Sequence, residues 1–213
     1  MRAILWAAII AGTSYCLPAW FGWHGPAVTA WKGAGVGLLA LWAATQARST
    51  GGWLIAAVMA LGATGDVLLD AIGLKAGAAA FLVGHLVAIA LYLRNRRVAL
   101  TPSQRLLGLI VAPLTVVIAL AMTADIGVAI YAAALGTMAA SAWTSSFPRY
   151  RVGLGAMLFV ASDLLIFSRS GPLAESFVPN LLVWPLYFAG QAMIATGVVA
   201  TLARRDGVPI SPA

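Results

Sequence analysis

Long apolar stretches alternate with short polar or Pro/Gly-rich breaks along the whole chain of 213 residues. A helix that crosses a bilayer needs about 20 mostly apolar residues, and each stretch is close to that length. Barrel strands would alternate in segments of about ten residues, whereas these stretches are continuously apolar and rich in Ala, Leu and Gly. The pattern predicts an all-α integral membrane protein, an eight-helix transmembrane bundle forming one domain over residues 1–213. The expected spans are 3–20, 27–45, 52–70, 77–93, 105–123, 125–142, 152–168 and 180–203.

Composition and charge place this bundle in a membrane and orient it. The chain is 62% hydrophobic and 9% charged, with a mean hydropathy of +0.95, which would leave large apolar patches on a water-soluble domain. With eight spans, ten Arg residues fall on one side, and Lys32, Lys75 and Arg169 fall on the other. This positive-inside bias predicts cytoplasmic termini in a bacterial inner (plasma) membrane. It also accounts for the net charge of +7 without a nucleic-acid partner; protein partners are left undefined.

Two carboxylates lie inside these apolar stretches in closely similar sequence, Gly65-Asp66-Val67-Leu68-Leu69 and Ser162-Asp163-Leu164-Leu165-Ile166. A charged side chain in the hydrocarbon costs at least ~2.5 kcal/mol, so an acid there indicates a functional site facing the bundle interior. Both acids lie near the outward ends of their spans, roughly 6–8 Å below the outer boundary. Their positions four spans apart predict a weak parallel four-plus-four repeat. Chance similarity among apolar helices would explain so short an echo equally well.

Other polar side chains are expected near the same level. His85 is roughly 12 Å into its inward-running span, and Tyr187 and Gln191 share one face of the last span at a spacing of i, i+4. Asp70 follows Asp66 by one turn, at the end of its span, and is more typical of a solvated boundary residue than of a site residue. The side chains together predict a polar pocket that opens toward the outer leaflet.

The chemistry of this pocket is narrowed by the motifs that the chain lacks. It has no Gly-x-Ser-x-Gly elbow, no His-Glu-x-x-His, and only two histidines, His24 and His85, which are too few for a three-histidine zinc centre. No metal and no cofactor is therefore predicted. Two carboxylates in a medium of low dielectric repel each other, which leaves one of them protonated near neutral pH. One could then donate a proton while the other activates water, as in glycosidases that stabilise an oxocarbenium-like cation.

Several short motifs in a fixed order resemble those of the YhhN-type lysoplasmalogenase family. Lys32 at the start of the second span is similar to a lysine of that family. The further motifs are Gly65-Asp66-x-Leu68-Leu69, Gly77-x-x-x-Phe81-x-x-x-His85, Tyr131 with Met138, Gly155-Ala156-Met157-Leu158-Phe159-x-x-Ser162-Asp163, and Tyr187-x-x-x-Gln191. The chain departs from the family at Gly33 and Ala88, where the family tends to have proline and an aromatic residue. These departures concern the acyl-chain pocket and the head-group preference more than the chemistry.

The resemblance implies an eight-span membrane hydrolase that cleaves the vinyl-ether bond of lysoplasmalogens to a fatty aldehyde and a glycerophospho-base. Asp66 and Asp163 are then the catalytic pair, and Lys32 is expected to hold the phosphate of a lysolipid that enters from the bilayer among the membrane lipids. Asp70, His85, Tyr131, Tyr187 and Gln191 are candidate substrate-binding residues. Lys32 would alternatively be a snorkelling anchor, and the buried polar side chains would alternatively be interhelical hydrogen-bonding groups.

Two other functions fit the same residues. The first is hydrolysis of a different lysolipid. The second is a lipid-binding protein or a proton-coupled transporter in which both acids relay protons. Pro185 is the only clear candidate helix breaker, and transporters of that type tend to have broken helices in both halves, which favours an enzyme.

Overall fold

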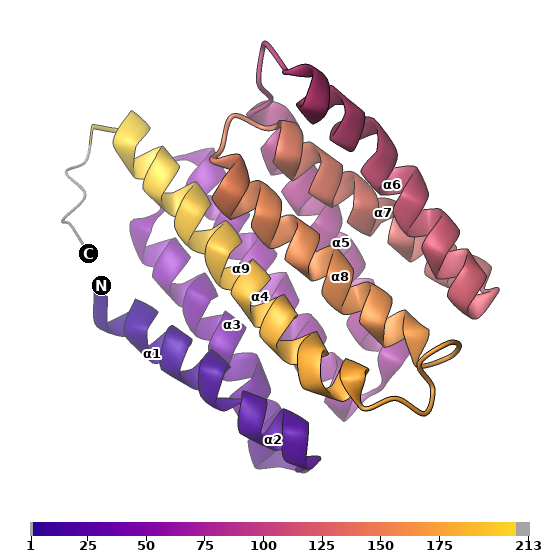
Figure 1. Cartoon of the computed structure of the whole chain (residues 1–213). Helices are drawn as coiled ribbons and strands as arrows, with labels where there is room; N and C mark the ends of the chain where they lie inside the picture. Colours follow the sequence, from indigo (N-terminus) through magenta and orange to yellow (C-terminus); the bar gives the residue numbers. More distant parts are fainter. Residues whose placement is uncertain (1, 208–213) are drawn as a thin grey trace.

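The computed structural model describes residues 2–207, which form helices joined by short connections (Figure 1). Eight of its helical stretches are long and apolar enough to cross a membrane, and residues 2–207 contain no strand. The chain is therefore an all-α multi-pass membrane bundle, as the sequence predicts. Its helices are α1 (Arg2–Ser14), α2 (Cys16–Phe21), α3 (Pro26–Gln46), α4 (Thr50–Ala71), α5 (Leu74–Arg94), α6 (Pro102–Thr123), α7 (Ile126–Thr144), η1 (Arg149–Gly153), α8 (Leu154–Ser168) and α9 (Val178–Arg205).

Short polar residues set where several helices begin. The Ser49 side chain accepts a hydrogen bond from the backbone at the start of α4, and Asp125 does the same at the start of α7. Thr101 and Gln104 form a reciprocal capping box at the start of α6. These side chains satisfy backbone N–H groups that have no partner within the helix, so the breaks in the hydropathy pattern become defined helix ends.

Helix interruptions differ from the expectation based on Pro185. The last span continues through Pro185 as one helix, and α6 likewise continues through Pro113, which the sequence analysis overlooked. The first span is instead divided near Tyr15 into α1 and the short α2. The seventh span begins with a π-helical turn, η1, ahead of α8. Proline alone therefore does not locate the interruptions in this chain, because neighbouring helices hold proline-containing helices together.

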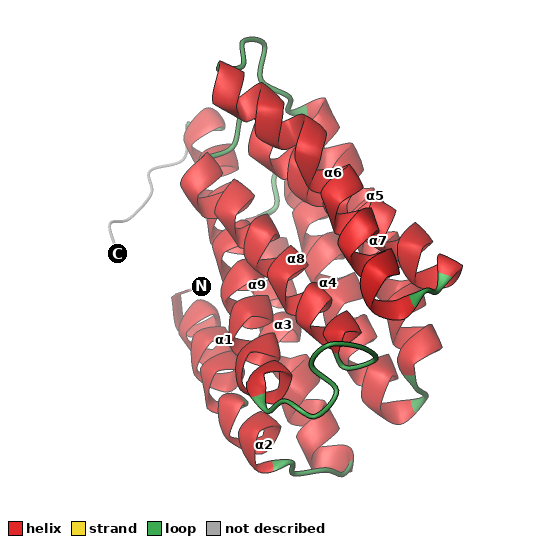
Figure 2. Cartoon of the chain, turned by 45° about the vertical axis from the view of Figure 1, so that its right-hand side comes forward, coloured by secondary structure: helices red, strands yellow, loops and turns green. Residues whose placement is uncertain are grey.

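Six of the helices form a closed ring of neighbours. Each helix packs against the next in the order α3, α4, α5, α7, α8, α9, and α9 packs back against α3. Helix α1 lies outside the ring against α3, and α6 lies outside it against α7 (Figures 1 and 2). This order agrees with a repeat of α3–α5 in α7–α9. The two halves are not equivalent, however. Helix α4 packs against α9, whereas the corresponding pair in the repeat, α5 and α8, does not pack together to the same extent. The parallel repeat stays a prediction.

The connections at the end of the bundle where α9 finishes are tied together by polar contacts. The backbone N–H of Ser146 donates to the carbonyl of Asn95 at 2.7 Å. Arg205 donates to the side chains of both residues, at 2.7 Å to Asn95 Oδ1 and 2.8 Å to Ser146 Oγ. Arg97 donates to the Ser145 carbonyl. Some arginines at this end therefore have a structural role, beyond any effect on topology.

Candidate functional site

Asp66 and Asp163 occupy matching places in the bundle. Asp66 lies in α4, five residues before Ala71, and Asp163 lies in α8, five residues before Ser168. Both side chains are buried, with 2% and 6% of their surface exposed. Both helices run in the same direction, so the two carboxyl groups lie at a similar distance from the same end of the bundle. Burying two acids is costly unless each has a hydrogen-bond partner.

Each acid accepts a hydrogen bond from a tyrosine of a different helix. Tyr187 of α9 donates to Asp66 Oδ2 at 2.8 Å, and Tyr131 of α7 donates to Asp163 Oδ2 at 2.7 Å. We call these the Asp66 pair and the Asp163 pair. Hydroxyl–carboxylate bonds of this length are among the stronger hydrogen bonds in proteins. The sequence predicts all four residues in one region but does not predict which tyrosine pairs with which acid.

Each tyrosine hydroxyl has a second polar neighbour. The Gln191 amide nitrogen donates to the Tyr187 hydroxyl at 3.4 Å, and His85 Nε2 lies 3.2 Å from the Tyr131 hydroxyl. Because a tyrosine hydroxyl both donates and accepts, each carboxyl is linked through its tyrosine to a nitrogen of the interior. His85 lies eleven residues into α5, because this helix begins at Leu74, three residues before the expected start of the span at residue 77.

Aromatic rings fill the space between the two pairs. The ring of Phe159 packs against Tyr187 and against His85, each at 5.1 Å between centroids. The ring of Phe81 contacts both Phe159 and Tyr187 edge-on. The two acids therefore belong to one packed cluster with an apolar centre. Phe81 and Phe159 were part of the sequence motifs but were not among the predicted site residues.

Lys32 and Asp70 form an ion pair beside this cluster, with Lys32 Nζ 2.7 Å from Asp70 Oδ1. Asp70 lies one turn beyond Asp66 on α4, and Lys32 reaches it from α3. Asp70 is exposed near the end of its helix, as expected for a boundary residue, and it also binds the lysine that was predicted to hold a phosphate. Both side chains retain some exposure, 14% for Lys32 and 32% for Asp70, so a ligand could reach them.

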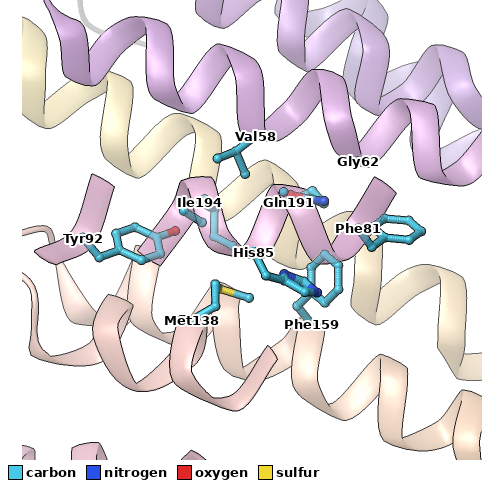
Figure 3. A pocket seen from close by; sticks show the side chains of 11 residues that line it. Val58, Gly62, Phe81, His85, Tyr92, Met138, Phe159, Gln191 and Ile194 are labelled. Carbon is cyan, nitrogen blue, oxygen red and sulfur yellow. The ribbon is translucent and has the colours of Figure 1, made fainter. Parts of the chain in front are cut away.

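A small cavity lies on the interior side of the cluster (Figure 3). Its volume is about 20 Å³, which is enough for one water molecule. His85 and Gln191 contribute polar atoms, and the other walls are largely apolar, from Val58, Gly62, Phe81, Gly84, Ala88, Tyr92, Met138, Phe159 and Ile194. It differs from the predicted polar pocket opening to the outer leaflet, because neither aspartate lines it.

Tyr92 is the polar residue of this cavity that the sequence analysis missed. Its hydroxyl is buried and has no hydrogen-bond partner among the described residues. Figure 3 shows Tyr92 and Phe81 at opposite ends of the cavity with His85 between them. Tyr92 follows His85 by seven residues on α5, and such a spacing places both on one helix face. The sequence could have indicated Tyr92 through this spacing from His85.

Acidic, histidine and cysteine side chains are the residues that could together hold a metal ion. Within residues 2–207 no three of them lie close enough together to hold a metal ion. The candidate site is therefore described by the two Tyr–Asp pairs, their nitrogen neighbours and the adjacent ion pair.

Comparison with protein families identifies the chain. The model of the YhhN family matches residues 27–198. The chain belongs to the YhhN family. The match covers α3 to most of α9, so it includes every residue of the two pairs and the Lys32–Asp70 ion pair. No curated protein and no solved structure gives a significant match. Membership in the YhhN family and the geometry described above are therefore the basis for assigning a function.

Proposed function

We propose that this YhhN protein is a membrane-embedded lysoplasmalogenase, which hydrolyses the vinyl-ether bond of single-chain ether lipids. The products are a fatty aldehyde and a glycerophospho-base. The observation that carries the proposal is the presence of two buried carboxyl groups, each bonded to a tyrosine, in a chain of this family. Acids inside membrane spans are rare and usually functional, and two of them can supply both a proton donor and a base.

The reaction requires both protonation states of a carboxyl group. One aspartic acid gives its proton to the β-carbon of the vinyl ether, which forms an oxocarbenium ion. The other aspartate stabilises that cation and takes a proton from water as the water oxygen bonds to the cationic carbon. The resulting hemiacetal loses the glycerol oxygen as an alcohol and becomes the aldehyde. One water is consumed, and each carboxyl regains its starting state through proton exchange.

The tyrosines are positioning residues in this scheme. A hydrogen bond from Tyr187 or Tyr131 fixes one carboxyl oxygen and leaves the other directed at substrate or water. The cavity of about 20 Å³ beside His85 and Gln191 has room for one water molecule close to this network. A fatty chain requires far more room, so binding of the lipid must separate neighbouring helices of the ring.

The Lys32–Asp70 ion pair suits a head group that carries both charges. Lys32 would bind the phosphate and Asp70 the ammonium group of the base, so that a zwitterionic lipid replaces one ion pair by two. Lys32→Met is expected to raise KM about fivefold for such a lipid, as for loss of a partly exposed charge contact, with kcat nearly unchanged. An unchanged KM would show that the lysine only anchors its helix at the interface.

Aldehyde release from purified protein tests the proposal directly. Lysoplasmalogen should be cleaved, with a solvent deuterium isotope effect when proton transfer to carbon limits the rate. The saturated alkyl-ether analogue should be inert, because it cannot form the cation by protonation at carbon. Cleavage of acyl lysolipids instead would identify the alternative hydrolase. Saturable lipid binding without product, in a folded preparation, would favour a transporter or a lipid-binding protein.

A further inference from the structure

A basic groove lies at the end of the bundle where α9 finishes, far from the two Tyr–Asp pairs. Its volume is about 390 Å³, within the range of ligand-binding pockets. The lining residues come from η1 with the residue before it and from the last turns of α9. They are Pro148, Arg149, Tyr150, Arg151, Gly197, Ala200 and Arg204. Three of the seven are arginines, which is far above the share of charged residues in the chain as a whole.

Small residues of α9 form one wall of this groove and allow η1 to approach. A Cβ atom on Gly197 would lie 2.7 Å from a methyl group of Val152 and 3.2 Å from Cβ of Arg151. Glycine is therefore needed at this position for η1 to pack as closely as it does. Ala200, one turn further on, leaves space where a larger side chain would fill the groove. The depression is thus a product of the helix packing.

No carboxylate of the described residues neutralises the charge of the groove. Within residues 2–207 none of Arg149, Arg151 and Arg204 forms an ion pair with a carboxylate. Arg149 lies over the ring of Tyr150, 5.0 Å from its centroid, and Arg204 donates to the Thr201 hydroxyl at 3.4 Å. Arg97 and Arg205 at the same end are instead engaged by loop carbonyls and polar side chains. The three groove arginines keep donors for an external anion.

The groove is lined by the ends of two membrane-spanning helices, where lipid head groups are expected. Arg149 begins the seventh span and Arg204 nearly ends the eighth. Trp143 packs edge-on against Tyr150, with 6.3 Å between centroids, and paired Trp and Tyr side chains are typical of the membrane interface. We propose that the groove binds the phosphate head group of an anionic phospholipid from the surrounding leaflet. Guanidinium groups bind phosphate in a bidentate manner, and basic pockets between transmembrane helices bind such head groups.

Occupancy of this groove would connect the two helices that complete the candidate site. The π-helical turn η1 leads into α8, which carries Asp163, and α9 carries Tyr187. A phosphate held by Arg149 or Arg151 and by Arg204 bridges these helices. Anionic lipid is therefore expected to stabilise the folded protein, since a ligand that binds only the folded state raises the unfolding temperature.

The test compares two triple variants in detergent, with phosphatidylglycerol as the probe. Arg149→Gln, Arg151→Gln and Arg204→Gln together remove the groove charges. The control triple removes three exposed arginines that lie outside the groove, at positions 94, 96 and 105. The groove triple should bind phosphatidylglycerol about 100-fold more weakly, since each basic residue near an anionic surface contributes roughly fivefold. The control should change by less than threefold and keep the lipid-dependent rise in unfolding temperature.

Three further arms decide the source of the anion and guard against misfolding. Phosphatidylcholine should bind much more weakly than phosphatidylglycerol, and millimolar inorganic phosphate should not compete. Ala200→Trp keeps every charge but fills the groove, so it should lose lipid binding while eluting as a monodisperse folded protein. Equal losses in both triples, equal binding of phosphatidylcholine, competition by phosphate, or full binding by Ala200→Trp would each overturn the proposal.

Discussion

The Asp66 pair and the Asp163 pair have the same first contact and different surroundings. Each carboxyl accepts from one tyrosine at nearly equal distance. Tyr187 is then bonded to the side-chain amide of Gln191, whereas Tyr131 is bonded to the imidazole of His85, whose ring nitrogens differ in whether they donate or accept. An ion pair lies one turn beyond Asp66, and Asp163 is followed one turn later by the apolar Phe167. The two acids therefore have the same hydrogen bond to a tyrosine but differ in the group bonded to that tyrosine and in the charge nearby.

The largest effect is expected from removing either carboxyl. Asp66→Asn and Asp163→Asn should each lower aldehyde release at least ~100-fold, because each removes one proton-transfer role. Asparagine keeps the size of the side chain and can still accept from the tyrosine, so both variants should remain folded. Unfolding temperature and gel filtration provide the control. Near-normal turnover by either folded variant would show that the replaced aspartate is not a catalytic residue.

A smaller loss is expected from the tyrosines. Tyr187→Phe and Tyr131→Phe each remove one hydrogen bond to a buried acid, which is worth about 1.5–3 kcal/mol, or roughly 10–100-fold in kcat if the bond orients the acid in the transition state. KM should change little. If Tyr131→Phe lowers kcat far more than Tyr187→Phe, Asp163 with its neighbour His85 is the acid that donates the proton. Equal and negligible losses would show that the tyrosines only satisfy buried acids.

Helix packing offers a matched comparison between the two halves. A Cβ atom on Gly190 would lie 2.6 Å from the carbonyl oxygen of Gly155, whereas one on Gly84 would lie 3.4 Å from Cβ of Leu61. Gly190→Ala must therefore push α8 and α9 apart and should cost about 1–3 kcal/mol. Gly84→Ala should be nearly neutral. Thermal unfolding of both variants measures the difference, and equal unfolding temperatures would contradict it.

The smallest effect on turnover is expected when His85 is replaced by an amide like Gln191. His85→Gln gives the Asp163 pair the same kind of amide neighbour that the Asp66 pair has, so a hydrogen bond to Tyr131 is kept and the imidazole is lost. We expect kcat within about fivefold of the wild type and a pH profile determined by the two carboxyl groups alone. A loss near that of Asp163→Asn would instead make His85 a proton-transfer residue.

Several features followed from the sequence because they depend on local composition. All eight spans are recognisable, since a bilayer demands length and apolar character that chance rarely supplies. Asp66 and Asp163 stood out for the same reason. The π-helical start of the seventh span and the division of the first near Tyr15 left no clear mark, because hydropathy does not distinguish between kinds of helical turn.

The contacts within the site did not follow, because they join distant parts of the chain. Tyr187 is 121 residues from Asp66, and Lys32 is 38 residues from Asp70. Such pairs depend on which helices become neighbours in the ring and on their rotation, and neither is encoded in a single span. The unpartnered hydroxyl of Tyr92 depends on side chains from five helices and is visible only in the assembled bundle.

Closure of the ring by α9 also sets the order of events when the chain is made. Spans emerge from the ribosome in sequence, so α4 enters the bilayer long before α9 supplies Tyr187. Until then Asp66 lacks the hydroxyl that satisfies it, in a medium where an unsatisfied acid is costly. The partly inserted bundle is therefore least stable just before its final span is inserted. A chain that stops short of α9 would leave this acid unpaired, which is the kind of defect that membrane quality-control proteases are suited to remove.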